Sequence, residues 1–84
     1  MTYVYAAEAL EALAGHGLAP AAATPPPRVR EALSDLYRYE IRRLKARLLQ
    51  GDIPQADYST HVIALRRRYW LLSVPVALWA ETRG

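Results

Sequence analysis

The feature that most constrains the fold is a pair of apolar stripes on either side of a short corner, "LLQGDIPQADY", at residues 48–58. The first stripe runs through residues 28–50 at three- and four-residue steps: Val29, Leu33, Leu36, Tyr37, Ile41, Leu44 and Leu48. The second runs through residues 54–70 and just beyond: Tyr58, Val62, Leu65, Tyr69 and Leu72. This spacing predicts two amphipathic helices. Because so few residues join them, we expect the helices to run antiparallel and to pack stripe against stripe.

The corner between the two helices contains residues suited to ending one helix and starting the next. Gly51 favours a helix end, because glycine adopts the left-handed conformation at little cost. With the proline at position 54 as N-cap, Ile53 and Tyr58 take the positions of a hydrophobic staple. If the helix starts one turn earlier, Asp52 and Gln55 form a pair resembling a capping box instead. Both alternatives close an αα-hairpin.

The segments around the hairpin predict short elements. Residues 1–14 are rich in Ala and Leu and predict a short N-terminal helix, mainly over residues 4–14. Residues 15–27 are rich in Gly, Pro and Ala and predict a linker, either a stiff spacer or a proline-rich ligand of the SH3 kind. Residues 28–84 then form the hairpin domain.

The end of the chain predicts one more helix. A short helix over about residues 75–81 would follow Ser73 as a cap, and the last three residues would fray. The expected fold class is therefore all-α: a long antiparallel hairpin with a short helix at each end. With 84 residues and no cysteine, the chain is a single small domain without disulfides, whose isolated core would be marginal.

The corner resembles the SHOCT family, a short C-terminal domain module. That module reads roughly as leucines, Gly-x-Ile-Thr-x-x-Glu-Phe, and a helix rich in Lys and Leu. The matching residues over about residues 41–70 are Leu44, Leu48, Gly51, Ile53, Asp57, Tyr58 and Leu65, while Pro54 stands where the family has Thr. The resemblance implies a small helical hairpin used for association and carries over no catalytic residue.

The sequence offers little for catalysis or for holding a cofactor. His16 lies between two glycines, and His61 is offset from the apolar stripe without a carboxylate at ligand spacing. No serine lies in a nucleophile-elbow motif, and the four glycines are too scattered for a phosphate-binding loop. We therefore expect no enzymatic activity, no metal site and no cofactor.

Charge is concentrated in the hairpin. Residues 38–68 carry eight basic and three acidic side chains, a net charge of +5, whereas residues 1–27 carry −2. The arginines proposed as a basic rim or as phosphate contacts are Arg38, Arg42, Arg43, Arg66, Arg67 and Arg68. Such a cluster could bind phosphates. It could equally be the solvated outer face that every amphipathic helix needs.

Aromatic and apolar residues exceed what a two-helix hairpin can cover. The candidates for binding a partner are Tyr3, Tyr5, Tyr39, Trp70, Leu78 and Trp79. Exposed aromatic patches usually mark interfaces, and Trp, Tyr and Arg are enriched in binding hot spots. The alternative is that all of these residues are internal core.

The leading functional expectation is a non-catalytic interaction module, either an accessory subunit of a larger complex or a self-associating adaptor. The alternatives are a nucleic-acid-binding protein that uses the basic side of the hairpin and a small regulator or inhibitor of an enzyme. No export signal or membrane span is visible, so the expected location is cytoplasmic.

Overall fold

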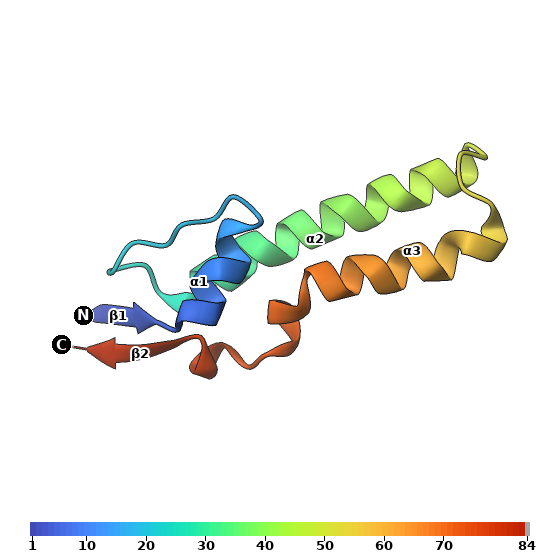
Figure 1. The fold of residues 1–84 in the computed structure, drawn as a ribbon. Coiled ribbons are helices and arrows are strands. Elements are labelled where there is room, and N and C mark those ends of the chain that lie inside the picture. The colour runs from blue at the N-terminus through green and yellow to red at the C-terminus, as the bar shows by residue number, and fades with distance from the viewer. Residues whose placement is uncertain (84) are drawn as a thin grey trace.

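The computed structural model describes residues 1–83, and over these residues the chain is mostly helical with one small sheet (Figure 1). The elements in chain order are β1 (Thr2–Tyr5), α1 (Ala7–Ala14), α2 (Pro26–Leu49), α3 (Gln55–Arg68), the 3₁₀ turns η1 (Trp70–Ser73) and η2 (Val76–Leu78), and β2 (Ala80–Arg83). The all-α expectation is correct for the hairpin and wrong at the two ends of the chain.

The hairpin of α2 and α3 forms as its apolar stripes predict, and the two helices lie side by side in Figure 1. Gly51 ends α2 with a φ of 81°. The N–H of Gly51 donates to the Leu48 carbonyl and that of Asp52 to the Arg47 carbonyl, which is the Schellman pattern. Pro54 is the N-cap of α3 without a side-chain cap bond, so the staple positions are correct and the capping-box alternative is wrong.

Two glycines at helix ends give a matched test of this local geometry. Gly51 has the left-handed φ that an L side chain tolerates poorly, whereas Gly15, the C-cap of α1, has a helical φ of −62°. We expect Gly51→Ala to lower the free energy of unfolding by about 1 kcal/mol. Gly15→Ala should raise it by about 0.5 kcal/mol, because the unfolded chain loses freedom. Urea denaturation measures both changes, and equal effects of the two substitutions would contradict this account.

The two ends of the chain pair as a sheet. β1 and β2 are antiparallel, with Thr2 opposite Arg83 and Tyr5 opposite Ala80. A helix starting near Val4, a helix over 75–81 and fraying at residues 82 and 83 are therefore incorrect expectations; Gly84 lies outside the described residues. The aromatic and β-branched run of residues 3–5 favours a strand, and pairing with the distant end of the chain stabilises it.

The Gly/Pro/Ala-rich linker is held against β1. The backbone N–H of Tyr3 donates to the Ala22 carbonyl at 2.8 Å, and the Tyr5 hydroxyl donates to the Thr24 carbonyl at 2.7 Å. Pro26 and Pro27, which the sequence places in the linker 15–27, are the first residues of α2, and Pro26 is buried. Pro25 is the extended N-cap of α2, so the triple proline leads directly into the helix.

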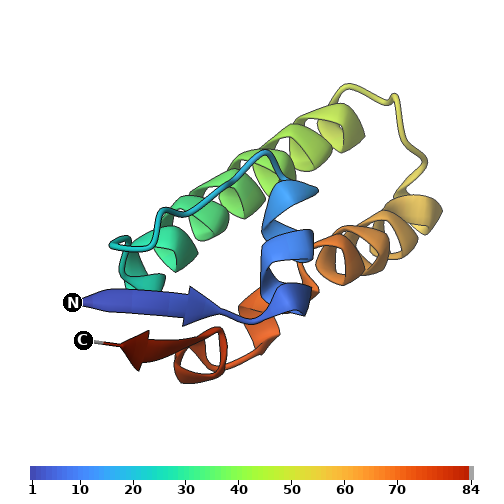
Figure 2. The ribbon, with the colours of Figure 1, turned by 60° about the vertical axis from the view of Figure 1, so that its left-hand side comes forward.

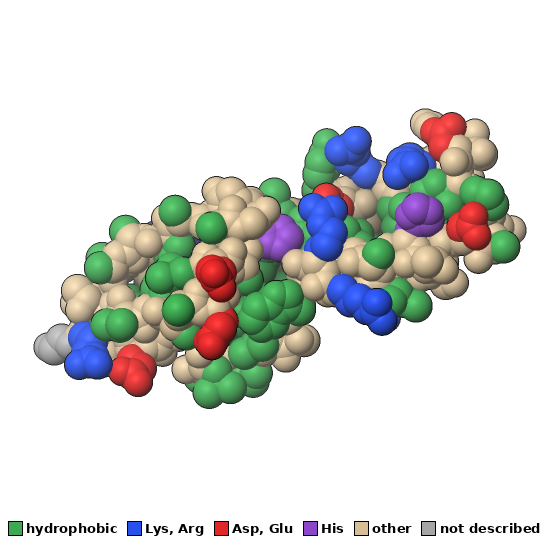
Figure 3. All heavy atoms as spheres, viewed as in Figure 1, with side chains coloured by type: hydrophobic (Ala, Val, Ile, Leu, Met, Phe, Trp, Pro, Cys, Tyr) green, Lys and Arg blue, Asp and Glu red, His purple; other side chains and the backbone are tan. Residues whose placement is uncertain are grey.

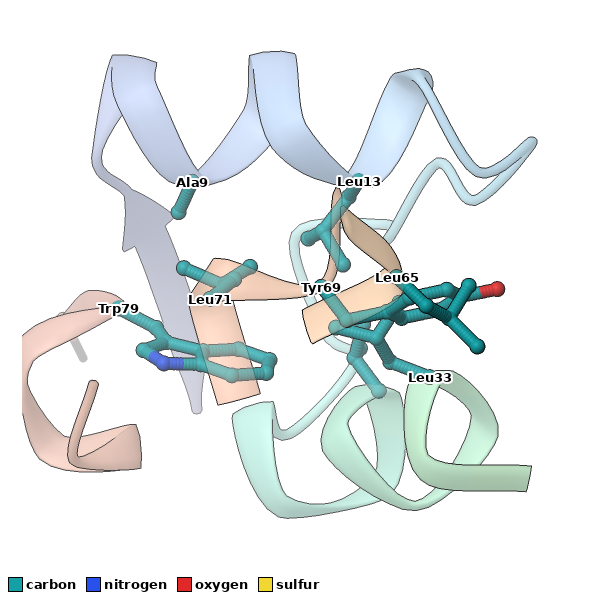
Figure 4. Close-up of a cluster of buried hydrophobic side chains, with 8 residues drawn as sticks. Ala9, Leu13, Leu33, Leu65, Tyr69, Leu71 and Trp79 are labelled. Carbon is teal, nitrogen blue, oxygen red and sulfur yellow. The ribbon is translucent and has the colours of Figure 1, made fainter. Parts of the chain in front are cut away.

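The core lies at the end of the molecule where the termini meet. Its buried members come from both helices of the hairpin and from the flanking segments: Ala9, Leu13, Val29, Leu33, Leu65, Tyr69, Leu71 and Trp79. Figure 4 shows most of them converging between α1, α2 and η1. Trp79, Leu13 and Leu33 are fully buried.

Beyond this core, residues 42–64 of the hairpin project as an arm (Figures 1 and 2). The molecule measures 52 × 17 × 16 Å, and its radius of gyration is 15.3 Å. A compact domain of this length would have a radius of gyration of about 12 Å. Within the arm, only Leu44 and Ile53 are buried, so most of its surface is available for contacts.

Candidate functional site

A cleft of about 290 Å³ lies between α2 and α3 where the arm leaves the core. We call it the basic cleft. Its lining residues are Glu40, Arg43, Leu44, Arg47, His61, Ala64, Leu65 and Arg68. The lining therefore includes three guanidinium groups, one carboxylate and the apolar side chains of Leu44, Ala64 and Leu65. In Figure 3, most of the visible Lys and Arg side chains lie over the right-hand half of the molecule, which carries the cleft.

Helical spacing on both sides of the hairpin builds the cleft. On α2 the polar lining residues Glu40, Arg43 and Arg47 follow one another at i, i+3 and i+7, so they share one flank of the helix. On α3 the residues His61 and Arg68 are also seven apart and share a flank. Sequence reasoning missed Glu40 and Arg47 as site residues and considered His61 only as a metal ligand. The matching spacings were the signal that could have found them.

Glu40 lies at the inner wall of the basic cleft and is incompletely satisfied. Its Oε1 atom is 3.6 Å from Nη1 of Arg68, a separation longer than a good charge-assisted hydrogen bond. Its Oε2 atom is buried and has no hydrogen-bond partner among residues 1–83. Because this oxygen has almost no accessible surface, a molecule in the cleft could not reach it, and the Tyr69 hydroxyl is the donor group beside Glu40.

Tyr69 lies next to this carboxylate. Its pKa is raised from 10.0 to about 12, first by burial and then by the acceptor character and negative charge of Glu40, while Arg68 acts in the opposite direction. Tyr69 also stacks on His16, with ring centroids 4.1 Å apart, and meets Tyr37 edge-on at 5.3 Å. His16 Nε2 makes a 2.8 Å hydrogen bond with the Arg68 carbonyl. These contacts fix the end of α3, and with it one wall of the cleft.

The raised pKa of Tyr69 predicts a loss of stability at high pH. The unfolded chain releases the phenol proton near pH 10, whereas the folded chain holds it until about pH 12. The stabilisation is therefore complete below pH 10 and is lost as the pH rises to 12, by up to about 2 kcal/mol. Urea denaturation between pH 9 and 12 should show a shallower decline for Tyr69→Phe than for the wild type. Equal slopes would contradict the assignment, since the raised pKa of Tyr5 acts in both proteins.

The predicted arginines do not form a single cluster. Arg43 and Arg68 line the basic cleft, whereas Arg42, Arg66 and Arg67 do not. Arg38 forms an exposed ion pair with Asp35 at 3.1 Å. Because successive helical residues point about 100° apart, Arg66, Arg67 and Arg68 do not all lie on the same side of α3.

The predicted aromatic anchors divide between core and surface. Trp79 has no exposed surface and donates its indole N–H to the Val74 carbonyl at 3.0 Å, so it is a core residue. Tyr3 and Tyr5 are half-buried in β1. Tyr39 is exposed, and its ring lies 5.8 Å from the guanidinium carbon of Arg43.

The remaining two anchors, Trp70 and Leu78, are 45% and 69% exposed. They lie on the two 3₁₀ turns that connect α3 to β2. We call the surface that carries Trp70 and Leu78 the apolar face. In Figure 3, hydrophobic side chains gather over these turns, below the body of the molecule. Leu78 also lines a shallow apolar hollow of about 400 Å³ together with Val4, Tyr5 and Ala77.

Comparisons of the chain with protein-family models, with curated proteins and with solved structures find no match. Within residues 1–83, no helix combines the length and the apolar character that crossing a membrane requires. Across the same residues, no three potential metal-ligating side chains come together.

Proposed function

We propose that the chain is a non-catalytic, cytoplasmic interaction module that docks on a larger protein through the apolar face. The observation that carries the proposal is the exposure of Trp70 and Leu78, on turns held rigidly against a core that includes their neighbours Leu71 and Trp79. Large exposed apolar side chains on a rigid support are typical of docking surfaces, and tryptophan is the residue most enriched in hot spots.

The charge of the hairpin supports the same proposal. Arg66 and Arg67 are exposed and lie four and three residues before Trp70. Cations at the rim of an apolar contact orient an acidic partner and accelerate association more than they add affinity. The resemblance of the corner to the SHOCT hairpin also favours association. If the partner is an enzyme, the chain would act as its regulator.

Affinity capture with matched variants tests this proposal. The tagged chain, its Trp70→Ala/Leu78→Ser variant and an Arg47→Gln control are used to capture proteins from native cells, with and without nuclease. We expect one stoichiometric protein with the wild type and with Arg47→Gln, unaffected by nuclease and lost with the double variant. Retention by the double variant would contradict the proposal. A second copy of the chain as the captured protein would identify self-association.

Nucleic-acid binding is the second candidate, favoured by the net charge of +5 on residues 38–68. In that case the captured material would be sensitive to nuclease, and the affinity would fall steeply with salt. Arg47→Gln would then weaken binding, whereas the Trp70→Ala/Leu78→Ser variant would not.

A further inference from the structure

The outer edge of β2 has no partner strand within residues 1–83. Tyr3 lies opposite Thr82 in the sheet, and the N–H of Tyr3 donates away from β2, to the Ala22 carbonyl. Tyr3 and Thr82 therefore form a non-hydrogen-bonded pair, so the N–H and C=O of Thr82 also point away from β1. No backbone group of residues 1–83 bonds to them, and β2 lies at the margin of the molecule in Figures 1 and 2.

The charges on this edge suit a second copy of the same strand. An open edge is a template for another strand, and proteins often protect it with charged side chains, above all lysine, which repel a like-charged copy. β2 is different, because Glu81 and Arg83 carry opposite charges on the same face of the sheet. These two side chains pair with each other at 3.2 Å and are 76% and 64% exposed, so both are available to a neighbouring strand.

A second copy related by a two-fold axis fits this edge in one register. An antiparallel arrangement with Thr82 opposite Thr82 of the second copy gives two reciprocal hydrogen bonds, each from one Thr82 N–H to the other Thr82 carbonyl. The same register places Glu81 opposite Arg83 of the second copy on both sides of the axis, in the pairs whose side chains lie closest. The neighbouring register would place Glu81 opposite Glu81 and is disfavoured by repulsion.

Pairing of two copies also extends a sheet that is small by itself. β1 and β2 have four residues each, and a sheet of two short strands is marginal without further strands. We propose that β2 pairs antiparallel with β2 of a second copy of the chain, centred on Thr82, to give a four-stranded sheet. The contact is small, so the dimer should form only at high concentration. This site goes beyond docking through the apolar face and contains neither Trp70 nor Leu78, so the two proposals can fail independently.

Sedimentation equilibrium of the full chain at concentrations up to about 1 mM tests the proposal. We expect the apparent mass to rise from 9.4 kDa toward twice that value. Glu81→Arg should weaken dimerisation at least about tenfold, because two attractive cross-strand pairs become repulsive, and Arg83→Glu should do the same. Asp35→Arg is the matched control. It disrupts a similar exposed ion pair, with Arg38, and changes the net charge as Glu81→Arg does, so it should leave dimerisation unchanged.

Two combinations make the test specific for this register. The double variant Glu81→Arg/Arg83→Glu exchanges the two charges and should dimerise like the wild type. A mixture of the two single variants should form a mixed dimer, since one edge is then basic and the other acidic. A wild type that stays monomeric at every concentration, or equal losses in Asp35→Arg and Glu81→Arg, would overturn the proposal. A double variant that dimerises as weakly as the single ones would also overturn it.

Discussion

Replacing Trp79 by alanine is expected to unfold most of the protein at room temperature. Trp79 is fully buried among the side chains of the core cluster, and its indole N–H is bonded to the Val74 carbonyl. Removing a buried tryptophan costs about 3–5 kcal/mol, through lost burial and the cavity left behind. A domain of this size has only a few kcal/mol of stability, so the loss is comparable to the whole.

Two further variants distinguish this core role from a surface role. Trp79→Phe keeps much of the apolar volume but loses the hydrogen bond to Val74, so its cost should be about half as large. Leu78→Ala changes the exposed neighbour and should stay within about 0.5 kcal/mol of the wild type. Thermal unfolding followed by circular dichroism measures all three. A stable Trp79→Ala protein would show that the ends of the chain are not packed as described.

The second large effect is expected on binding and not on folding. Trp70→Ala should weaken the affinity for the captured protein partner by about 2 kcal/mol or more, a loss of at least about thirtyfold. The reason is that Trp70 is 45% exposed on the apolar face and offers a large rigid ring for burial in a partner pocket. Calorimetry or surface plasmon resonance with the purified partner gives the dissociation constant.

The controls for this effect come from other exposed positions. Leu49→Ala, on an arm residue that is 78% exposed, should leave the affinity unchanged. Arg66→Gln should mainly slow association, and this effect should shrink as salt is added. If Leu49→Ala and Trp70→Ala weakened binding equally, the docking surface would extend along the arm and would not be confined to the apolar face.

The hairpin could be predicted from sequence because its signals are local and repeated. The apolar stripe from Val29 to Leu48 spans the full length of α2, and Gly51 and Pro54 carry the conformational preferences that their positions require. These preferences act within a few residues, so no knowledge of distant contacts is needed. α2 begins at Pro26, two residues before the predicted segment 28–50, because proline is well suited to the first positions of a helix.

The ends of the chain could not be predicted in the same way. β2 consists of Ala80, Glu81, Thr82 and Arg83, and only the threonine favours a strand by itself. Its conformation comes from pairing with Thr2–Tyr5, nearly the whole chain away. Trp79 is buried for the same reason, since the pairing places it beneath α1, and a sequence pattern near a terminus cannot indicate that.

The candidate site was predicted in part. The excess of arginine was visible, and Arg43 and Arg68 do meet in the basic cleft. Which arginines meet depends on how far each helix is rotated about its axis, and the apolar stripe defines that rotation only roughly. Glu40, Arg43 and Arg47 are spaced at helical intervals along α2, so no run of adjacent charges marks them in the sequence.

Amide hydrogen exchange of the chain, alone and bound to its captured partner, tests docking through the apolar face most directly. The account predicts new protection in residues 70–78, which carry Trp70 and Leu78, with little change at the corner around Gly51. Protection confined to the arm, with residues 70–78 exchanging as freely as before, would contradict it.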